Sequence, residues 1–179
     1  MKVSKEQVAK HRASILDAAG RLFRQRGFDS VTVAEIMKEA GLTHGAFYGY
    51  FPSKEALIAE AAEHALIPPA TRAPAATYAD NYLSVQHRDN HATGCVFASL
   101  GTEAARGSDD LRHRMTESVR RQIDRFAAEA KGRTASDRRQ AAIAAWSSMV
   151  GAMMLARLVD DEALSKEILS ATRASLPLA

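Results

Sequence analysis

Residues 43–54 contain the side chains whose chemistry best suits contact with a nucleic acid. His44 brings ring nitrogens that bond base edges or phosphates, while Gly45 and Ala46 are small enough to let the backbone approach base edges and thymine methyl groups. Hydroxyls and a lysine cation suit phosphates, whose contacts fix position without reading sequence. The predicted DNA-contacting residues are Thr32, Thr43, His44, Gly45, Ala46, Tyr48, Tyr50 and Lys54.

The sequence contains no pattern typical of a catalytic or metal site. It has no glycine-rich phosphate loop, no metal-binding histidine pair on a helix and no nucleophile elbow. One cysteine, Cys95, excludes an intrachain disulfide and a multi-cysteine zinc site. We therefore expect no enzymatic activity, no metal and no cofactor; a helical small-molecule carrier or enzyme is the alternative class. The histidines are scattered, at His11, His44, His64, His87, His91 and His113.

Two helices come before the DNA-contacting stretch. Apolar residues recur at helical spacing over about 4–26, and Gly27 follows where a left-handed cap is expected. Thr32 and Glu35 have the spacing of a capping box, so a second helix begins there. Gly41 ends this second helix.

The DNA-contacting stretch itself forms a third, short helix over 43–48, which Thr43 can cap. A fourth helix is expected over 53–66. Phe47 and Phe51 are expected to pack in the core beneath the contact residues. Helix, glycine-containing turn and helix make a helix-turn-helix, whose second helix presents its N-terminal residues to DNA.

This N-terminal sequence resembles the TetR family of DNA-binding regulators over about residues 10–60. Many positions agree at fixed spacing, which makes the resemblance specific, although it covers under a third of the chain. It implies a dimeric, ligand-responsive, all-helical protein without identifying the ligand. The matching residues are Ile15 to Ala19, Leu22-Phe23, Gly27-Phe28, Val31-Thr32-Val33, Ile36, Ala40 to Thr43, Gly45 to Tyr48, Tyr50-Phe51, Ser53-Lys54 and Leu57.

The remainder of the chain also has the composition of a helical domain. Three prolines between 66 and 76 mark the clearest break. No long stretch alternates with the two-residue period of a strand. The predicted fold is all-α with about nine helices: a helix-turn-helix domain over 1–52, a connecting helix over 53–66, and a regulatory and dimerisation domain over 67–179. Its helices are expected near 75–87, 94–106, 109–131, 135–158 and 160–176.

Charge supports this division only weakly. Residues 1–54 carry nine Lys or Arg and five Asp or Glu, in a chain whose net charge is +3. A basic N-terminal domain suits phosphate contact. The uncharged, mainly apolar run over 141–156 is shorter than the roughly 20 residues that span a bilayer, and the N-terminus has no signal peptide. We expect a soluble cytoplasmic protein without a membrane partner.

The last two helices are the predicted dimer interface. Small residues occupy more than one face of the helix over 135–158, which is typical of a helix buried on several sides. The helix over 160–176 carries an apolar stripe, and the same pair from a second subunit would complete a four-helix interface. The alternative is that the small residues only let the first helix pass through the core of its own subunit.

An apolar effector pocket is expected among the middle helices, although each of its residues also suits plain core. Glu103, Arg106 and Arg120 either contact the ligand or form surface ion pairs. The predicted lining is Tyr78, Tyr82, Phe97, Met115, Trp146, Met149 and Met153.

Cys95 provides an alternative mode of sensing. Thr93-Gly94-Cys95 is read as a helix start, where a thiol can have a lowered pKa and therefore greater reactivity. His87, Arg88 and His91 could strengthen this effect. The surrounding segment resembles a subgroup of TetR-family regulators in some of which a cysteine senses electrophiles. The other interpretation is a small buried hydrophobic residue.

The sequence therefore predicts a homodimeric transcriptional repressor. It would bind palindromic double-stranded operator DNA and release it when a small molecule, not identified by the sequence, binds the body. The alternative is a regulator that senses electrophiles or oxidants through Cys95. An activator or a corepressor-dependent regulator fits the same residues. Coupling is expected to run from the pocket through the fourth helix.

Overall fold

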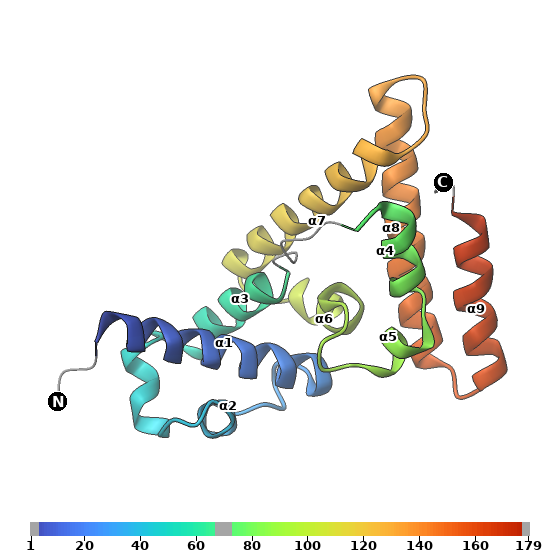
Figure 1. Ribbon diagram of the computed structural model, residues 1–179. Coiled ribbons are helices and arrows are strands. Elements are labelled where there is room, and N and C mark those ends of the chain that lie inside the picture. The colour runs from blue at the N-terminus through green and yellow to red at the C-terminus, as the bar shows by residue number, and fades with distance from the viewer. Residues whose placement is uncertain (1–3, 67–72, 177–179) are drawn as a thin grey trace.

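The computed structural model describes residues 4–66 and 73–176, and within these ranges every regular element is a helix (Figure 1). The predicted all-α fold is confirmed. In chain order the helices are α1 (Lys5–Arg26), α2 (Val33–Glu39), the 3-10 helix η1 (His44–Gly49), α3 (Lys54–Ala65), α4 (Ala75–Tyr82), α5 (Val85–Asp89), α6 (Val96–Ala104), α7 (Asp109–Glu129), α8 (Ala135–Leu158) and α9 (Glu162–Ser175).

The boundaries of α1 and α2 follow from their caps. The Ser4 hydroxyl accepts a hydrogen bond from the backbone of Gln7 at 3.1 Å and starts α1. Gly27 ends it with a φ of 81°, a left-handed value that glycine adopts easily. At α2 the predicted capping box is present, because the Thr32 hydroxyl accepts from the Glu35 N–H at 3.2 Å and the Glu35 carboxylate accepts from the Thr32 N–H at 2.8 Å.

The third helix differs in type from the prediction. It is the 3-10 helix η1, not the expected short helix over 43–48, and Thr43 makes no side-chain capping bond to it. The carbonyl of Phe47 accepts hydrogen bonds from both Tyr50 N–H at 2.9 Å and Phe51 N–H at 3.1 Å. So short a segment forms few α-helical bonds, and its turns tighten into 3-10 geometry.

The core of this N-terminal head is aromatic. Phe47 and Phe51 are each 1% exposed, which confirms that they pack beneath the contact stretch. Their rings stack with centroids 6.0 Å apart. Phe23 of α1 and Ile36 of α2 are buried with them. The four helices α1, α2, η1 and α3 therefore share one hydrophobic centre.

One predicted helix of the body is two helices. The segment expected over 75–87 breaks into α4 and α5 at Leu83, which leaves helical geometry with ψ 36°. The Ser84 hydroxyl then accepts from the His87 N–H at 3.1 Å and caps α5. Serine is a favoured N-cap, so Ser84 was a local signal for a second helix start. The described residues thus form ten helices where about nine were expected.

Helix α8 runs through the body. Its inner face is the core, with Ala145, Trp146, Met149 and Met153 each at most 5% exposed. By length and composition α8 is apolar enough to cross a membrane, a test that core helices of soluble proteins also pass. The uncharged run over 141–156 is thus part of a longer helix. Figure 1 shows α8 and α9 side by side at the end of the molecule away from α2.

Helix α6 connects the body to the head. The Glu103 carboxylate accepts a hydrogen bond from the Phe28 N–H at 2.7 Å. Before α6, the Ala92 carbonyl accepts from Arg24 Nε at 2.8 Å. Helix α3 packs against both α1 and α7 and forms a second connection. The head is therefore attached to the body through two elements.

Candidate nucleic-acid interface and effector cavity

The surface of η1 is exposed where the sequence predicts DNA contact. Thr43, His44 and Gly45 are exposed and Ala46 is half-buried. Tyr48 is 72% exposed, whereas its neighbour Phe47 is buried. The Thr43 hydroxyl, which makes no cap bond, is available to a phosphate. These residues form one surface, at the start of a helix in a helix-turn-helix.

The small size of Gly45 is not required by the fold. A Cβ added there meets no atom within 4 Å, and the φ of Gly45 is not positive. Packing and backbone geometry both accept a larger residue at this position. A glycine on an exposed helix start instead suits close approach by another molecule.

Three of the predicted contact residues already have partners within the head. Lys54 Nζ donates to the Phe28 carbonyl at 2.7 Å, and the Tyr50 hydroxyl lies 2.8 Å from His11 Nδ1. The Thr32 hydroxyl donates to the Glu35 carboxylate at 2.8 Å in addition to its cap bond. Their contact with DNA stays a prediction, and it would be made with side chains that the head already orients.

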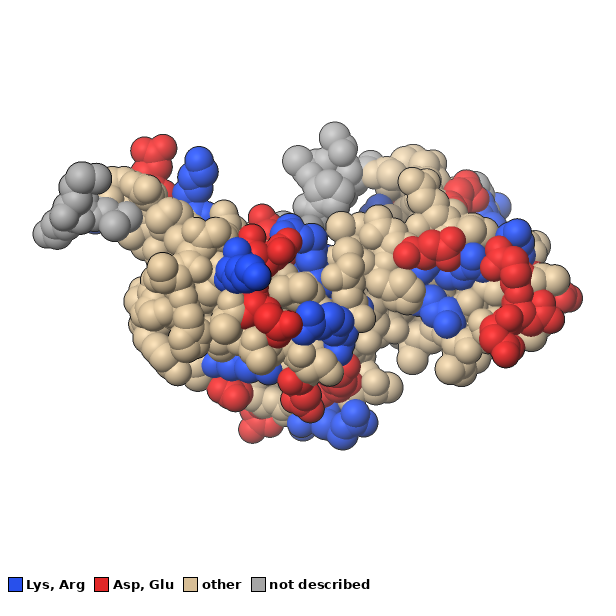
Figure 2. Space-filling view, turned by 90° about the horizontal axis from the view of Figure 1, so that it is seen from below, with Lys and Arg blue, Asp and Glu red and all other residues tan. Residues whose placement is uncertain are grey.

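The surface charge near the head is mixed. Figure 2 views the molecule from the side on which α2 lies, and it shows Lys and Arg interleaved with Asp and Glu. Ion pairs explain part of this pattern, since Arg21 pairs with Glu39 at 3.2 Å and Arg26 pairs with Glu35 at 2.8 Å. The net basic charge of the head is thus partly neutralised locally.

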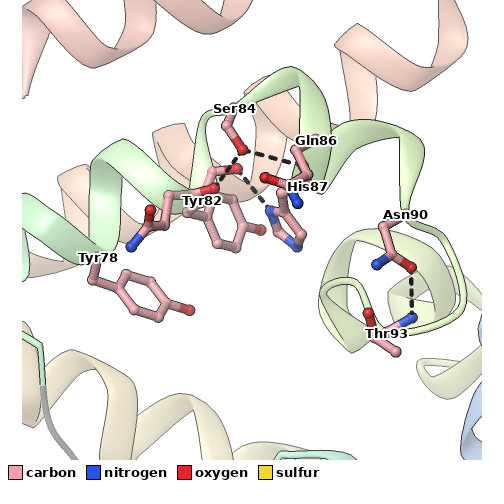
Figure 3. A pocket seen from close by; sticks show the side chains of 8 residues that line it. Tyr78, Tyr82, Ser84, Gln86, His87, Asn90 and Thr93 are labelled. Carbon is pink, nitrogen blue, oxygen red and sulfur yellow. Dashed lines mark hydrogen bonds between the residues drawn. The ribbon is translucent and has the colours of Figure 1, made fainter.

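Two adjoining cavities lie in the body. The inner one, of about 250 Å³, is bounded by residues of α3 to α8. The outer one, of about 400 Å³, is bounded by residues of α4 and α5 and the segment before α6. Both cavities are lined by Tyr78, Tyr82, His87 and Thr93, so the two adjoin at these side chains. Figure 3 shows the rings of Tyr78 and Tyr82 extending from α4, with His87 beside Tyr82 and with Thr93 across the space.

The structure brings together four of the seven residues predicted to line the effector pocket. Tyr78, Tyr82, Phe97 and Trp146 line the inner cavity. Met115, Met149 and Met153 are buried but border neither of these two cavities. They lie on the stripes of α7 and α8 that pack in the core. Methionines at helical spacing do not distinguish a cavity wall from core.

The three polar residues considered for ligand contact lie elsewhere. Glu103 and Arg106 border a groove between head and body, and Arg120 is exposed and pairs with Glu117 at 2.6 Å. Glu103 is instead a contact to the head, through the Phe28 N–H.

Arg125 is a cavity residue that sequence reasoning missed. It lines the inner cavity from α7, and its guanidinium lies 4.5 Å from the centroid of the Tyr78 ring. The signal was present in the spacing. Arg125 follows Gln122 by three residues on the buried stripe that contains Leu111 and Met115, and a charged residue on such a stripe needs a reason.

Cys95 lies in the wall of the inner cavity, but its environment is not the one expected. It is the residue before α6, not within its first turn. Burial raises the pKa of the thiol, which opposes formation of a thiolate. The cations expected to lower this pKa do not do so, because Arg88 pairs with Asp89 and Glu162 and His91 is exposed.

His87 is neutral and joins three elements around the thiol. Its Nδ1–H donates to the Tyr82 carbonyl, 2.7 Å away, and its Nε2 accepts from the Cys95 N–H at 3.1 Å. Burial lowers the pKa of His87, in agreement with an acceptor at Nε2. Arg157 of α8 adds hydrogen bonds to the His87 carbonyl and to Ser99 Oγ, both at 3.0 Å.

One face of α8 has no partner within the described chain. Met154, Leu155 and Leu158 are 39%, 52% and 78% exposed, and Ile143 is 43% exposed. A Cβ added at Gly151, on the same helix, meets no atom within 4 Å. The opposite face is core, as the interpretation of a helix passing through its own subunit requires, while a dimer interface at the exposed face stays a prediction. Leu164 of α9 extends the exposed apolar surface.

Comparison with known proteins agrees with this architecture. Residues 15–61 match the family model described as bacterial regulatory proteins, tetR family. Residues 75–172, more than half of the chain, match the model of the tetracyclin repressor-like C-terminal domain. The chain belongs to the TetR family. The TetR-family head thus comprises α1 to α3, and the second model covers α4 to α9.

Relatives of this TetR-family chain resemble it chiefly in the head. The regulator AcrR of Shigella flexneri is 44% identical over 57 residues, 32% of this chain and 26% of that protein. The uncharacterized regulator YuxN of Bacillus subtilis is 54% identical over 44 residues, 25% of this chain and 15% of that protein. The chain thus matches well under two thirds of the length of these relatives.

Solved structures extend the likeness to the whole fold. A TetR-family regulator from Agrobacterium tumefaciens covers 95% of this chain, with 99% of its own length, at a TM-score of 0.73 and 19% identity. The reduced form of NemR from E. coli covers 93% of this chain, with 94% of its own length, at a TM-score of 0.67 and 23% identity. At these identities the likeness establishes the fold.

Proposed function

We propose that this protein is a dimeric transcriptional repressor that releases operator DNA when a small molecule occupies the body cavity. The observation that carries the proposal is the exposed start of η1, where Gly45 has open space around it although the fold does not require a glycine. The family membership supports the same function, and a regulator of this kind acts in the cytoplasm.

Dimerisation through α8 and α9 supplies the second head. A short recognition helix reads few base pairs, so affinity requires two heads related by a two-fold axis and a palindromic operator. The exposed apolar face of α8, with Leu155 and Leu158, suits a self-complementary interface. Leu164 of α9 adds to it from the neighbouring helix.

Effector response requires that the ligand bind the released state better than the DNA-bound state. The cavity is lined by α6, and α6 also bonds to the head through Glu103. A shift of α6 would therefore act on the head at the end of α1. The predicted route through the fourth helix, α3, provides a second path through its packing on α7.

A mobility-shift titration with the DNA that flanks the protein's own gene tests the proposal. We expect specific binding that weakens steeply with salt, because phosphate contacts release counterions. Gly45→Leu should fold normally, since its surroundings are empty, and lose specific binding at least about tenfold through collision with the DNA. Ala128→Leu, an exposed change on α7, is the matched control. Equal binding by both variants would contradict the proposed contact surface.

One observation supports a second candidate function, the sensing of electrophiles or oxidants through Cys95. Cys95 borders the inner cavity, so an electrophile or oxidant that enters it meets a thiol. NemR, one of the similar structures, was solved in a form described as reduced. In the same titration, Cys95→Ser should leave ligand-induced release intact under the leading proposal and abolish release by electrophiles under this one. The raised pKa of the thiol favours the leading proposal.

A further inference from the structure

Two buried polar groups of the inner cavity have no hydrogen-bond partner in the described part of the chain. These are the Tyr82 hydroxyl and Nε of Arg125. Tyr82 is 4% exposed, and the Cys95 thiol beside its hydroxyl is only a weak hydrogen-bonding group. A buried donor without an acceptor is costly, so it calls for a molecule that supplies one.

Arg125 also forms no ion pair with a carboxylate among the described residues. Its Nη2 donates to the Ala73 carbonyl at 2.9 Å, and its face lies over the ring of Tyr78. The nearby carboxylates are engaged elsewhere: Asp124 pairs with Arg139 at 2.8 Å, and Glu129 accepts from the Ala75 N–H at 2.6 Å. Among the described residues, no Asp or Glu lines either cavity. The cavity is therefore suited to an anion and unsuited to a cation.

The walls of the inner cavity are aromatic. The ring centroids of Tyr78 and Tyr82 lie 5.8 Å apart, and those of Tyr82 and Trp146 lie 5.5 Å apart. Phe97 meets Trp146 edge to face at 5.9 Å. Such rings favour a flat apolar body through stacked and edge contacts. A volume of about 250 Å³ is just below the usual range for ligand pockets, which suits a compound of one or two rings.

We propose that the inner cavity binds a small planar carboxylate, an aromatic or conjugated acid. Its oxygens accept hydrogen bonds from Arg125 and from the Tyr82 hydroxyl, and its flat body lies against Tyr78 and Trp146. Both donors adjoin the Tyr78 ring, since the Arg125 guanidinium is 4.5 Å and the Tyr82 ring 5.8 Å from its centroid. The role of this acid as effector rests on the proposed function, whereas its binding does not.

Calorimetric titration of the full chain with three matched probes tests the proposal without DNA. The probes are 2-naphthoate, the neutral 2-naphthamide and the cationic 2-naphthylmethylamine. We expect the carboxylate to bind at least about tenfold more tightly than the amide, because charge-assisted hydrogen bonds are the stronger ones. The amine should bind most weakly. Quenching of Trp146, the one tryptophan of the sequence, reports that the probe is in the inner cavity.

Two variants assign the donors. Arg125→Gln should weaken 2-naphthoate about ten- to a hundredfold and leave 2-naphthamide nearly unchanged. Tyr82→Phe keeps the ring and should weaken 2-naphthoate by several-fold. Arg120→Gln, on the same helix but exposed, is the control and should change neither probe. Tyr82→Phe also keeps the test decisive if Arg125→Gln fails to fold.

Equal or tighter binding of the amide or the amine would overturn the proposal, and so would the absence of binding by all three probes up to about 1 mM. Loss of 2-naphthoate affinity in Arg120→Gln but not in Arg125→Gln would do the same. Adding the probes to the mobility-shift titration separates the two proposals. If 2-naphthoate binds but operator affinity does not change, the carboxylate site stands and effector-induced release by this class of compound fails.

Discussion

Arg88 and Arg125, two arginines of the body, differ in how many of their polar atoms have partners. Arg88 is 8% exposed and fully engaged, with hydrogen bonds to Asp89 and Ser165 at 2.7 Å and an ion pair to Glu162. Its bonds to Asp89 and then Glu162 raise the pKa of Arg88 and lower the pKa of both carboxyl groups. Arg125 has no such carboxylate among the described residues. Arg88 thus serves the fold through its partners, whereas Arg125 keeps hydrogen-bonding capacity that the described residues do not use.

The Tyr82 hydroxyl makes this difference measurable. Tyr82→Phe should stabilise the ligand-free protein by about 0.5–1 kcal/mol, because it removes a buried hydroxyl without a partner and keeps the ring. In a thermal melt this corresponds to a rise of roughly 1–4 °C in Tm for a protein of this size. Tyr48→Phe removes an exposed hydroxyl and should leave Tm unchanged. A clear fall in the Tm of Tyr82→Phe would show that the hydroxyl already has a partner within the fold.

Helix α6 contacts both the inner cavity and the head within its nine residues. Its first residues, Val96 and Phe97, line the inner cavity, and Glu103 near its end bonds to the Phe28 N–H. The fit at the head is close, since a Cβ added at Gly27 would lie 2.9 Å from the Glu103 carboxylate. A rigid helix with both contacts can transmit a displacement from cavity to head.

Removal of the Glu103 contact should loosen this attachment. Glu103→Ala leaves the partly buried N–H of Phe28 without its acceptor. It should lower the free energy of unfolding by about 1–2 kcal/mol. Amide exchange at Phe28 should quicken in the same variant. Glu103→Gln retains an acceptor oxygen and should lose less, and Arg106→Ala in the same groove is the control. Unchanged exchange at Phe28 in Glu103→Ala would rule out this hydrogen bond as the attachment.

Sequence patterns predicted which segments are helical better than they predicted where a helix breaks. Caps at Thr32 and Gly27 fixed helix ends because their signals are local. The break between α4 and α5 was missed, although the Ser84 cap that starts α5 is also a local signal. The cavity was predicted only in part. Tyr78 and Trp146 belong to different helices, and no local pattern distinguishes a cavity wall from core where their packing decides it.

The exposed face of α8 determines how the whole molecule is expected to assemble. Leu155→Glu places a charge in the middle of that face, where burial against a second subunit would leave it unpaired. We expect sedimentation to show a shift from dimer to monomer at micromolar concentration, with operator affinity reduced at least about tenfold. Thr116→Glu, exposed on α7, should remain dimeric. A dimeric Leu155→Glu protein would place the interface elsewhere.

The shortness of η1 limits how much sequence information one subunit can extract. Six residues at the 3-10 rise cover about 12 Å, which corresponds to roughly three or four base pairs. Three base pairs distinguish about 64 sequences, and two such heads distinguish about 4,000. A bacterial chromosome of about a million base pairs would then contain hundreds of chance matches. Recognition of one operator on the chromosome must therefore use information that η1 does not read, such as the spacing of half-sites and the stiffness of the DNA between them.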